Sequence, residues 1–298
     1  MTKKILYLLF TFFSFSNSIN AQSPHFEFLK ILKNKMNVEV NVVFQDNSGF
    51  IWIGTNQGLV KYDGIEFFPF TTSNGLTSNE ITAIAQDSTG TLWIGHRNGT
   101  VNTFDNENII SFIPEEGLSS VEISSFLTTK SNTVWFTTFG EGVYYWGGKN
   151  RKRIYNVNAD DGLLDNYTYS IVQGDNSRLY IATDKGVSVY DTTKHAIIDS
   201  ITMAEGLPDN IVKHLCYTSD KMLWIAMEDG GICNYDIEKK KFNIFGNWLF
   251  GSINNFVAVN PKELWISTKR NGVVRLNVDE NNKVWYKEFT KTQGLQGN

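Results

Sequence analysis

The chain offers few side chains whose spacing suits catalysis or metal binding. Its four histidines are His25, His96, His195 and His214, and they lie in separate parts of the sequence without the spacing of metal ligands. Stretches such as Gly-x-Ser-x-Gly or His-Glu-x-x-His, which mark hydrolase and metalloprotease sites, do not occur. We therefore expect no metal, no cofactor and no catalytic residue. His96 opens a polar stretch, and we expect it to be a solvated loop residue.

The cysteines and the paired carboxylates do not indicate chemistry either. Cys216 and Cys233 could form a disulfide outside the cytoplasm. In the repeat described below one strand separates them, which places their Cα atoms about 9–10 Å apart at about 4.8 Å per strand. A disulfide needs Cα atoms within about 7 Å, so we expect two free thiols. The acidic pairs at 115–116 and 160–161 each precede a Gly-Leu pair, so we interpret them as turn residues rather than an acid–base pair.

Six short polar stretches, each closed by glycine, hold the side chains that could act together. They are TNQG (55–58), HRNG (96–99), TFGEG (138–142), TDKG (183–186), MEDGG (227–231) and TKRNG (268–272). Their amides, charges and the ring of Phe139 suit a polar ligand such as an oligosaccharide, and loops on a rigid scaffold commonly carry binding residues. The alternative is that each stretch is an ordinary solvated turn. The candidate ligand-binding residues are Asn56, Gln57, Arg97, Asn98, Glu141, Asp184, Lys185, Glu228, Asp229, Lys269 and Arg270.

These stretches recur because the whole chain is a repeat. An aromatic residue returns every 41 to 45 positions, at Trp52, Trp93, Trp135, Tyr180, Trp224 and Trp265. A small residue stands two positions after each aromatic, and a glycine follows after six or seven. Six copies in phase indicate a repeat architecture, which must be identified before any local pattern is interpreted.

Each copy predicts four short strands. In the second copy the segment 80–87 alternates apolar and polar residues, as a strand does, and DSTG (87–90) has the residues of a β-turn. Four antiparallel strands at this period form the blade of a β-propeller, so we predict an all-β fold. The aromatic would fill the wedge between neighbouring blades, and the loops after the second strands would converge around a central channel.

The motif resembles the two-component regulator propeller repeat. The segments DNSGFIWIGTNQGLVKYDG (46–64) and NGLTSNEITAIAQDSTGTLWIG (74–95) carry the resemblance, which extends from about residue 38 to 298. Tyr180 in place of Trp, and FGNWLFG (245–251) in place of Gly-Leu, depart from it. The resemblance implies an extracytoplasmic sensor, which in family members often responds to glycan breakdown products. It also implies further modules beyond residue 298, such as a membrane helix and a kinase or DNA-binding domain, which could pair two copies as a homodimer.

The two ends of the chain lead to further expectations. Lys3 and Lys4 precede an apolar stretch that is short for a membrane span, and Ala21 precedes Gln22 at a plausible cleavage point. We expect a signal peptide over 1–21, a segment with a closing strand over 22–37, and the propeller over 38–298. The alternative for 1–21 is an uncleaved anchor. GLQGN at the C-terminus begins another repeat, so we expect the six visible blades to belong to a seven-bladed ring; the alternative is a closed six-bladed ring.

Function is predicted from these features and from the charge. A formal net charge of −4 does not favour a nucleic-acid partner, and we expect no membrane span after the signal peptide. We predict a periplasmic or otherwise extracytoplasmic sensor that binds a small polar ligand on the channel face. The opposite face, with basic turns at 149–153 and 239–241, should not contact it. The alternatives are a protein-interaction scaffold and a secreted propeller lyase.

Overall fold

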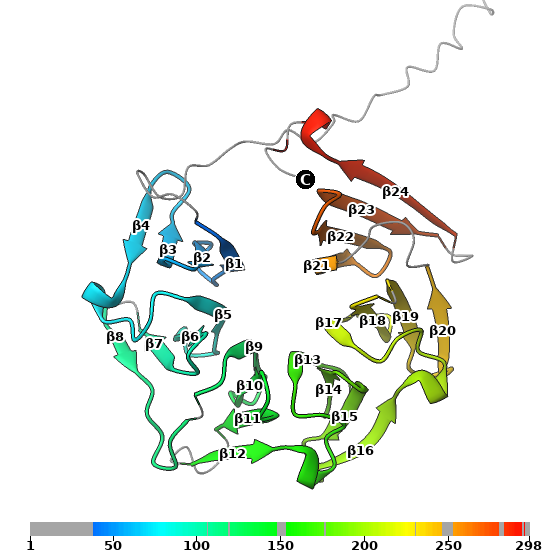
Figure 1. Ribbon diagram of the computed structural model, residues 1–298, viewed down its shortest axis with the longest axis horizontal. Coiled ribbons are helices and arrows are strands. Elements are labelled where there is room, and N and C mark those ends of the chain that lie inside the picture. The colour runs from blue at the N-terminus through cyan, green and yellow to red at the C-terminus, as the bar shows by residue number, and fades with distance from the viewer. Residues whose placement is uncertain are drawn as a thin grey trace, which may run out of the picture.

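The computed structural model describes residues 38–105, 107–118, 120–147, 153–175, 177–229, 231–245, 253–279, 283–293 and 295. They form six four-stranded antiparallel sheets arranged as the blades of a ring (Figure 1). Short 3₁₀ turns are the only helical elements in these ranges. The expected all-β propeller with six blades is confirmed. The signal peptide with its cleavage point, and the closing strand, were predicted for residues that lie outside the described ones.

Strand order in each blade follows the chain, and the first strand is innermost (Figure 1). The first three blades are β1 (Val40–Gln45), β2 (Ile51–Thr55), β3 (Gly58–Tyr62), β4 (Phe67–Phe70); β5 (Ile81–Gln86), β6 (Leu92–His96), β7 (Val101–Phe104), β8 (Ile109–Ser111); and β9 (Ile123–Thr128), β10 (Val134–Thr138), β11 (Val143–Trp146), β12 (Ile154–Val157). The last three are β13 (Thr168–Gln173), β14 (Arg178–Thr183), β15 (Gly186–Asp191), β16 (Ala196–Ile201); β17 (Val212–Tyr217), β18 (Met222–Met227), β19 (Ile232–Asp236), β20 (Lys241–Ile244); and β21 (Ile253–Asn260), β22 (Glu263–Thr268), β23 (Val273–Val278), β24 (Val284–Phe289). The 3₁₀ turns are η1 (Thr72–Asn74), η2 (Ala159–Asp161), η3 (Met203–Glu205) and η4 (Lys291–Gln293).

A buried aspartate connects the first turn of a blade to its wedge tryptophan. Asp87 Oδ1 accepts hydrogen bonds from the backbone N–H groups of Thr89 and Thr91, at 2.9 and 3.1 Å, and so holds the β5–β6 turn. Its other oxygen, Oδ2, accepts the indole N–H of Trp93 at 3.1 Å. Asp46 holds the first-blade turn in the same way and accepts the Trp52 indole N–H at 2.8 Å. One carboxylate thus fixes both the turn and the orientation of the aromatic ring.

The wedge aromatics pack between neighbouring blades. The Trp52 ring centroid lies 5.4 Å from that of Phe104 in the second blade, and the Trp93 centroid lies 5.3 Å from that of Trp146 in the third. The ring of Trp265 instead stacks on Phe289 of its own blade. Rings buried on both sides contribute large apolar area to the interfaces, which is why the aromatic recurs.

Close approach between blades explains the small residue that follows the aromatic. A Cβ built at Gly54 would lie only 2.7 Å from Cγ2 of Ile81 in the next blade. The Gly-Leu pairs have a different task. Gly75 ends the turn η1 with a φ of 103°, in the left-handed region that favours glycine, and the following Leu76 is buried.

The blades are joined along the axis of the ring. From β1 to β21, each innermost strand packs against the innermost strand of the next blade (Figure 1). Between the described strands of the sixth and first blades no comparable packing occurs. Six blades are therefore observed, and a seventh stays a prediction. No described segment forms a helix long and apolar enough to cross a membrane.

Candidate ligand-binding site at the channel mouth

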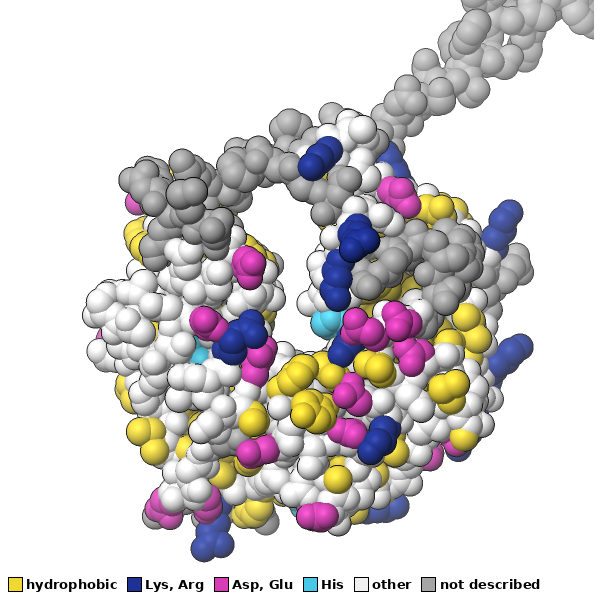
Figure 2. All heavy atoms as spheres, in the orientation of Figure 1, with side chains coloured by type: hydrophobic (Ala, Val, Ile, Leu, Met, Phe, Trp, Pro, Cys, Tyr) yellow, Lys and Arg dark blue, Asp and Glu magenta, His cyan; other side chains and the backbone are white. Residues whose placement is uncertain are grey.

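The innermost strands surround a central channel that opens on the face seen in Figure 2. A cavity of about 920 Å³ occupies it, and hydroxyl, amide and imidazole groups contribute to its wall, among them Thr82, Ser124, Ser170, His214 and Asn254. The loops after the second strands lie on the same face as the connections between blades. Their backbones bond directly, because Arg97 N donates to Glu80 O at 3.1 Å and Phe139 N to Glu122 O at 3.0 Å. Two of these loops are thus joined to the connections between blades on this face.

Every innermost strand carries a β-bulge at its second residue, where the pairing register skips one position. The bulged residues are Asn41, Thr82, Ser124, Tyr169, Lys213 and Asn254. A bulge kinks a strand and redirects the side chain of the extra residue. The six positions therefore decide what each blade presents where its innermost strand begins.

In the first three blades the side chain at the bulge is short, and it donates a hydrogen bond to a backbone carbonyl of the next blade. Asn41 Nδ2 donates to the carbonyl of Ile81 at 2.8 Å, and Thr82 Oγ1 donates to the carbonyl of Ile123 at 2.6 Å. Ser124 Oγ repeats the pattern with the first residue of β13, at 2.7 Å. In the fourth and fifth blades, Tyr and Lys occupy this position, and their long side chains instead contact the loops at the mouth.

These two residues organise a group that we call the Tyr169 cluster: Tyr169, Asp184, Lys213, Glu228 and Lys269. The Tyr169 hydroxyl donates to Asp184 Oδ1 at 2.7 Å, and Lys213 Nζ lies 3.7 Å from the centroid of the tyrosine ring. Lys213 Nζ also lies 3.3 Å from Glu228 Oε2, and Lys269 Nζ lies 3.7 Å from Glu228 Oε1. The cluster thus links the fourth, fifth and sixth blades through one cation–π contact and two ion pairs.

An aromatic surface adjoins the cluster. Phe139 contacts Tyr169 and Tyr167 edge to face, with centroids 5.2 and 5.5 Å apart. Phe139 is 42% exposed and Tyr167 46% exposed, so both rings can be reached from solvent. Figure 2 shows hydrophobic side chains beside the opening, with acidic and basic side chains around them. Burial raises the pKa of Tyr169, and the Asp184 carboxylate raises it further, so the phenol stays a hydrogen-bond donor.

A second charged group stands on the second and third blades. Arg97 lines the channel cavity, and its Nε lies 2.7 Å from Glu80 Oε2 while its Nη1 lies 3.1 Å from Glu122 Oε2. Burial raises the pKa of Glu122, although the Arg97 guanidinium opposes this shift. Arg97 is therefore held by two carboxylates at the channel wall.

The structure brings some of the predicted residues together. Asp184, Glu228 and Lys269 meet in the Tyr169 cluster, and Lys185, next to Asp184, pairs with Asp165 at 3.0 Å. Arg97 reaches the channel wall as described. Asp229 lies on the same loop as Glu228, and its backbone N–H donates to Asp209 Oδ2 at 3.2 Å. Arg270 is exposed on the loop of Lys269.

The structure assigns other predicted residues to local tasks. Asn56 Oδ1 accepts the backbone N–H of Glu39 at 3.0 Å, and the Gln57 N–H donates to Thr55 Oγ1 at 3.0 Å. Asn98 Oδ1 accepts from Thr100 Oγ1 at 2.7 Å and closes its own turn. Glu141 Oε2 accepts the hydroxyl of Tyr144, on the third strand of the blade, at 2.7 Å. Glu141 therefore turns toward the outer strands rather than toward the channel.

Sequence reasoning missed Tyr167, Tyr169 and Lys213. A signal for two of them exists in the repeat, because Tyr169 and Lys213 replace short polar residues at an aligned position. His96 was placed wrongly as a solvated loop residue. It is fully buried, its Nε2 lies 2.8 Å from Asn102 Oδ1, and burial lowers its pKa.

Two other expectations can be compared with the structure. Cys216 and Cys233 are free thiols, on strands that flank β18, as predicted from the repeat. Among the described residues, no group of three or more His, Cys, Asp and Glu side chains is arranged to hold a metal ion.

Comparisons with known proteins agree with the repeat. The family described as "Two component regulator propeller" matches the chain at residues 34–57 and 75–98. The recognition made from the sequence is thereby confirmed: this chain carries the two-component regulator propeller repeat. No curated protein matches it significantly.

Solved structures of low identity share the fold. One, named for the extracellular domain of a hybrid two-component system from B. thetaiotaomicron, has a TM-score of 0.71 at 20% identity over 87% of this chain and 36% of that chain. A second from that organism, named for a one-component system, has a TM-score of 0.60 at 17% identity over 85% and 44%. A catalytically inactive virginiamycin B lyase from Staphylococcus aureus has a TM-score of 0.66 at 13% identity over 89% and 87%. The chain thus spans less than half the length of the two extracellular domains.

Proposed function

We propose that this chain is the extracytoplasmic ligand-sensing propeller of a two-component signal transduction regulator, and that it binds a polar ligand such as an oligosaccharide at the channel mouth. The repeat family and the extracellular domains that share the fold support the sensor role. In this proposal the chain itself is not an enzyme, and a kinase or DNA-binding output would lie in other parts of a longer protein.

The observation that carries the proposal is the Tyr169 cluster beside exposed aromatic rings. Carboxylates and ammonium groups can exchange hydrogen bonds with sugar hydroxyls, while the rings of Phe139 and Tyr167 offer apolar faces for the C–H face of a pyranose. Buried polar groups discriminate between ligands because a poor fit leaves them unpaired. Residues from four blades meet here, so a bound ligand would contact several blades at once.

The alternatives are less well supported. A protein-interaction scaffold does not need charged side chains that meet around a channel. The lyase likeness is at 13% identity and extends to the fold alone.

The test is a calorimetric titration of the chain with a panel of oligosaccharides. Lys213→Met removes the central positive charge and keeps an unbranched side chain of similar length. Tyr169→Phe removes only the hydroxyl group that donates a hydrogen bond to Asp184. We expect each variant to weaken binding at least tenfold. Lys239→Ala, on a basic turn of the opposite face, is the matched control and should bind like the wild type. Unchanged affinity in Lys213→Met, or a loss only in Lys239→Ala, would contradict the site.

The coding sequence after Asn298 tests the signalling role, since we expect a membrane helix and an output domain there.

A further inference from the structure

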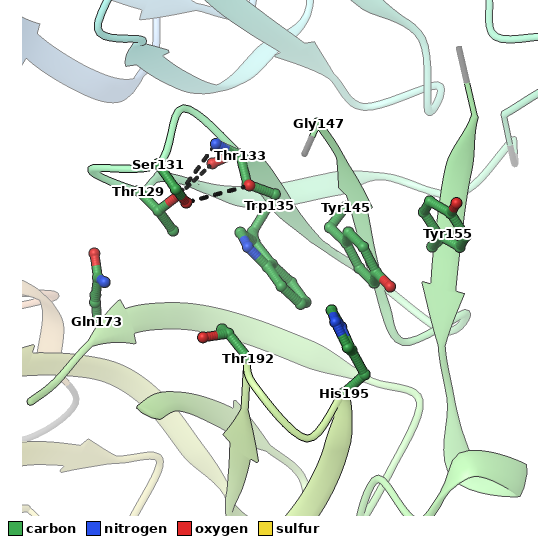
Figure 3. Close-up of a pocket in the computed structure, with 10 residues that line it drawn as sticks. All are labelled: Thr129, Ser131, Thr133, Trp135, Tyr145, Gly147, Tyr155, Gln173, Thr192 and His195. Carbon is green, nitrogen blue, oxygen red and sulfur yellow. Dashed lines mark hydrogen bonds between the residues drawn. The ribbon is translucent and has the colours of Figure 1, made fainter. Parts of the chain in front are cut away.

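A second pocket lies between the third and fourth blades, on the face opposite the channel mouth. It has a volume of about 500 Å³ and opens between the β9–β10 turn and the β15–β16 turn (Figure 3). Small-molecule sites in proteins span about 300–1,000 Å³. The lining residues are Thr129, Ser131, Thr133, Trp135, Tyr145, Gly147, Tyr155, Gln173, Thr192 and His195.

Beside this pocket the third blade lacks the turn aspartate. Thr129 stands where Asp46 and Asp87 stand in the first two blades, six residues before the wedge tryptophan. Its Oγ1 accepts the backbone N–H of Thr133 at 3.1 Å, which reproduces the turn. A hydroxyl has no second oxygen, however, so the acceptor that holds the indole N–H in the first two blades is missing. The turn is therefore kept, but the Trp135 indole N–H has no acceptor from it.

The indole of Trp135 is thereby left with an unused donor that faces the pocket. No described residue accepts a hydrogen bond from its N–H, and in Figure 3 the indole nitrogen is on the side where Gln173 lies. The fifth blade provides the contrast. Thr218 replaces the aspartate there too, but Phe245 stacks on Trp224 at 5.2 Å, and the Trp224 N–H is buried without a partner. Threonine thus replaces the aspartate in both blades, but the tryptophan N–H is covered in the fifth blade and lies beside a pocket in the third.

The lining combines stacked rings with neutral polar groups. The Trp135 and Tyr145 rings stack with centroids 4.3 Å apart, and Tyr145 and Tyr155 stack at 4.9 Å. Tyr155 is 40% exposed. Hydroxyls of Thr129, Ser131, Thr133 and Thr192 and the amide of Gln173 surround the rings, while Asp, Glu, Lys and Arg are absent from the lining. A cationic ligand would therefore find no carboxylate in the lining, and His195 is the one lining side chain that can carry a positive charge.

We propose that this pocket binds a single neutral sugar ring, independently of the channel mouth. The C–H face of a pyranose packs against Tyr155, the exposed end of the stack of Trp135, Tyr145 and Tyr155. Its hydroxyls accept from the Trp135 indole N–H and exchange hydrogen bonds with the Thr, Ser and Gln side chains of the lining. This assigns a binding role to a face from which the sequence predicted no ligand contact.

The test uses the full chain and a panel of monosaccharides, D-glucose, D-galactose, D-mannose and N-acetyl-D-glucosamine, measured by saturation-transfer NMR and calorimetry. We expect at least one to bind. Thr129→Asp restores the residue of the first two blades, so it should fold normally, capture the Trp135 N–H and weaken binding at least tenfold. Tyr155→Ala should weaken binding to a similar extent. The matched control is Thr218→Asp with Asp220→Ser, which makes the same change in the fifth blade and should bind like the wild type.

Several outcomes would overturn the proposal. They are no binding by any monosaccharide of the panel, unchanged binding in a folded Thr129→Asp variant, and binding of adenosine in preference to every sugar. Lys213→Met, which disrupts the channel site, should leave binding to this pocket unchanged. Failure of this proposal and failure of the proposed function are therefore distinguishable.

Discussion

Replacement of Asp87 by Thr should show how much the hydrogen bond between the Asp87 carboxylate and the Trp93 indole contributes to stability. Asp87 is buried, and its two oxygens serve two different partners, the backbone of the β5–β6 turn and the indole N–H of Trp93. The third blade shows that a threonine can hold the turn by itself, because Thr133 N donates to Thr129 Oγ1. The variant should therefore keep the turn and lose the acceptor for the indole.

The structure sets the expected magnitude. Trp93 is buried between Phe112 and Trp146, with centroids 5.0 and 5.3 Å away, so water has little access to a freed N–H. An unsatisfied buried donor costs about 1–3 kcal/mol, and we expect a loss of about 2 kcal/mol in the free energy of unfolding. For a chain of this size, about 2–4 °C accompany each kcal/mol, so the melting temperature should fall by about 4–8 °C.

Urea unfolding followed by circular dichroism measures the loss, and a double-mutant cycle isolates its cause. Trp93→Phe removes the indole N–H, so in that background Asp87→Thr should cost much less. We expect a coupling energy of about 1–2 kcal/mol between the two positions. A coupling near zero would refute the reasoning, because the loss would then come from the turn alone.

The reciprocal change, Thr218→Asp with Asp220→Ser, should raise stability by about 1 kcal/mol, since Trp224 gains an acceptor.

Three further predictions concern stability. Trp93→Ala should cost about 3–5 kcal/mol, as expected for an emptied aromatic core site, and a loss below about 1 kcal/mol in urea unfolding would contradict the wedge role. Thr82→Val, which removes the bond to the Ile123 carbonyl, should cost about 1 kcal/mol by the same measurement, whereas an unchanged midpoint would show that this bond does not join the blades. Burial lowers the pKa of His214 from 6.5 to about 4, so the unfolded chain takes up a proton first as the pH falls. Stability should therefore decline between about pH 6.5 and about pH 4 by about 1–3 kcal/mol. The difference in unfolding free energy between wild type and His214→Gln should be constant above about pH 7 and change by this amount below it, which measures the effect.

The architecture could be predicted from the sequence because the blade motif is repeated six times. The blades were predicted from the repeat period, the position of the aromatic residue and the turn residues. The face that carries the loops was predicted from the strand order of a blade. The site was harder to predict, because equivalent loop positions have different neighbours. Glu141 bonds to Tyr144 on an outer strand, whereas Glu228 meets Lys213 at the channel. Which of the two occurs depends on the side chains near each loop, and the bulge at Lys213 is visible only in the strand register.

Departures from the repeat carry more functional information here than its regular positions do. Tyr169 and Lys213 depart from the short bulge residues and build the channel cluster. Thr129 departs from the turn aspartate, lines the second pocket and leaves the Trp135 indole N–H without the acceptor that the first two blades have. In both cases the regular residue would complete a structural contact, and its replacement leaves side chains available to a ligand. A comparison of aligned positions within the one sequence therefore points to candidate sites once the blades are known.

The sixth blade leads to the last prediction, because one of its faces has no described neighbour. Val257 and Trp285 lie on the face of Trp265 and are 58% and 54% exposed, whereas Ala85, which pairs with the second-blade tryptophan as Val257 pairs with Trp265, is 7% exposed. Large exposed apolar patches favour association. We expect the chain to self-associate in analytical ultracentrifugation, and we expect Val257→Lys with Trp285→Lys to reduce that association. A chain extended by a seventh blade should be monomeric and melt at a higher temperature. If the 298-residue chain is already monomeric and the extension adds no stability, a closed six-bladed ring describes it better.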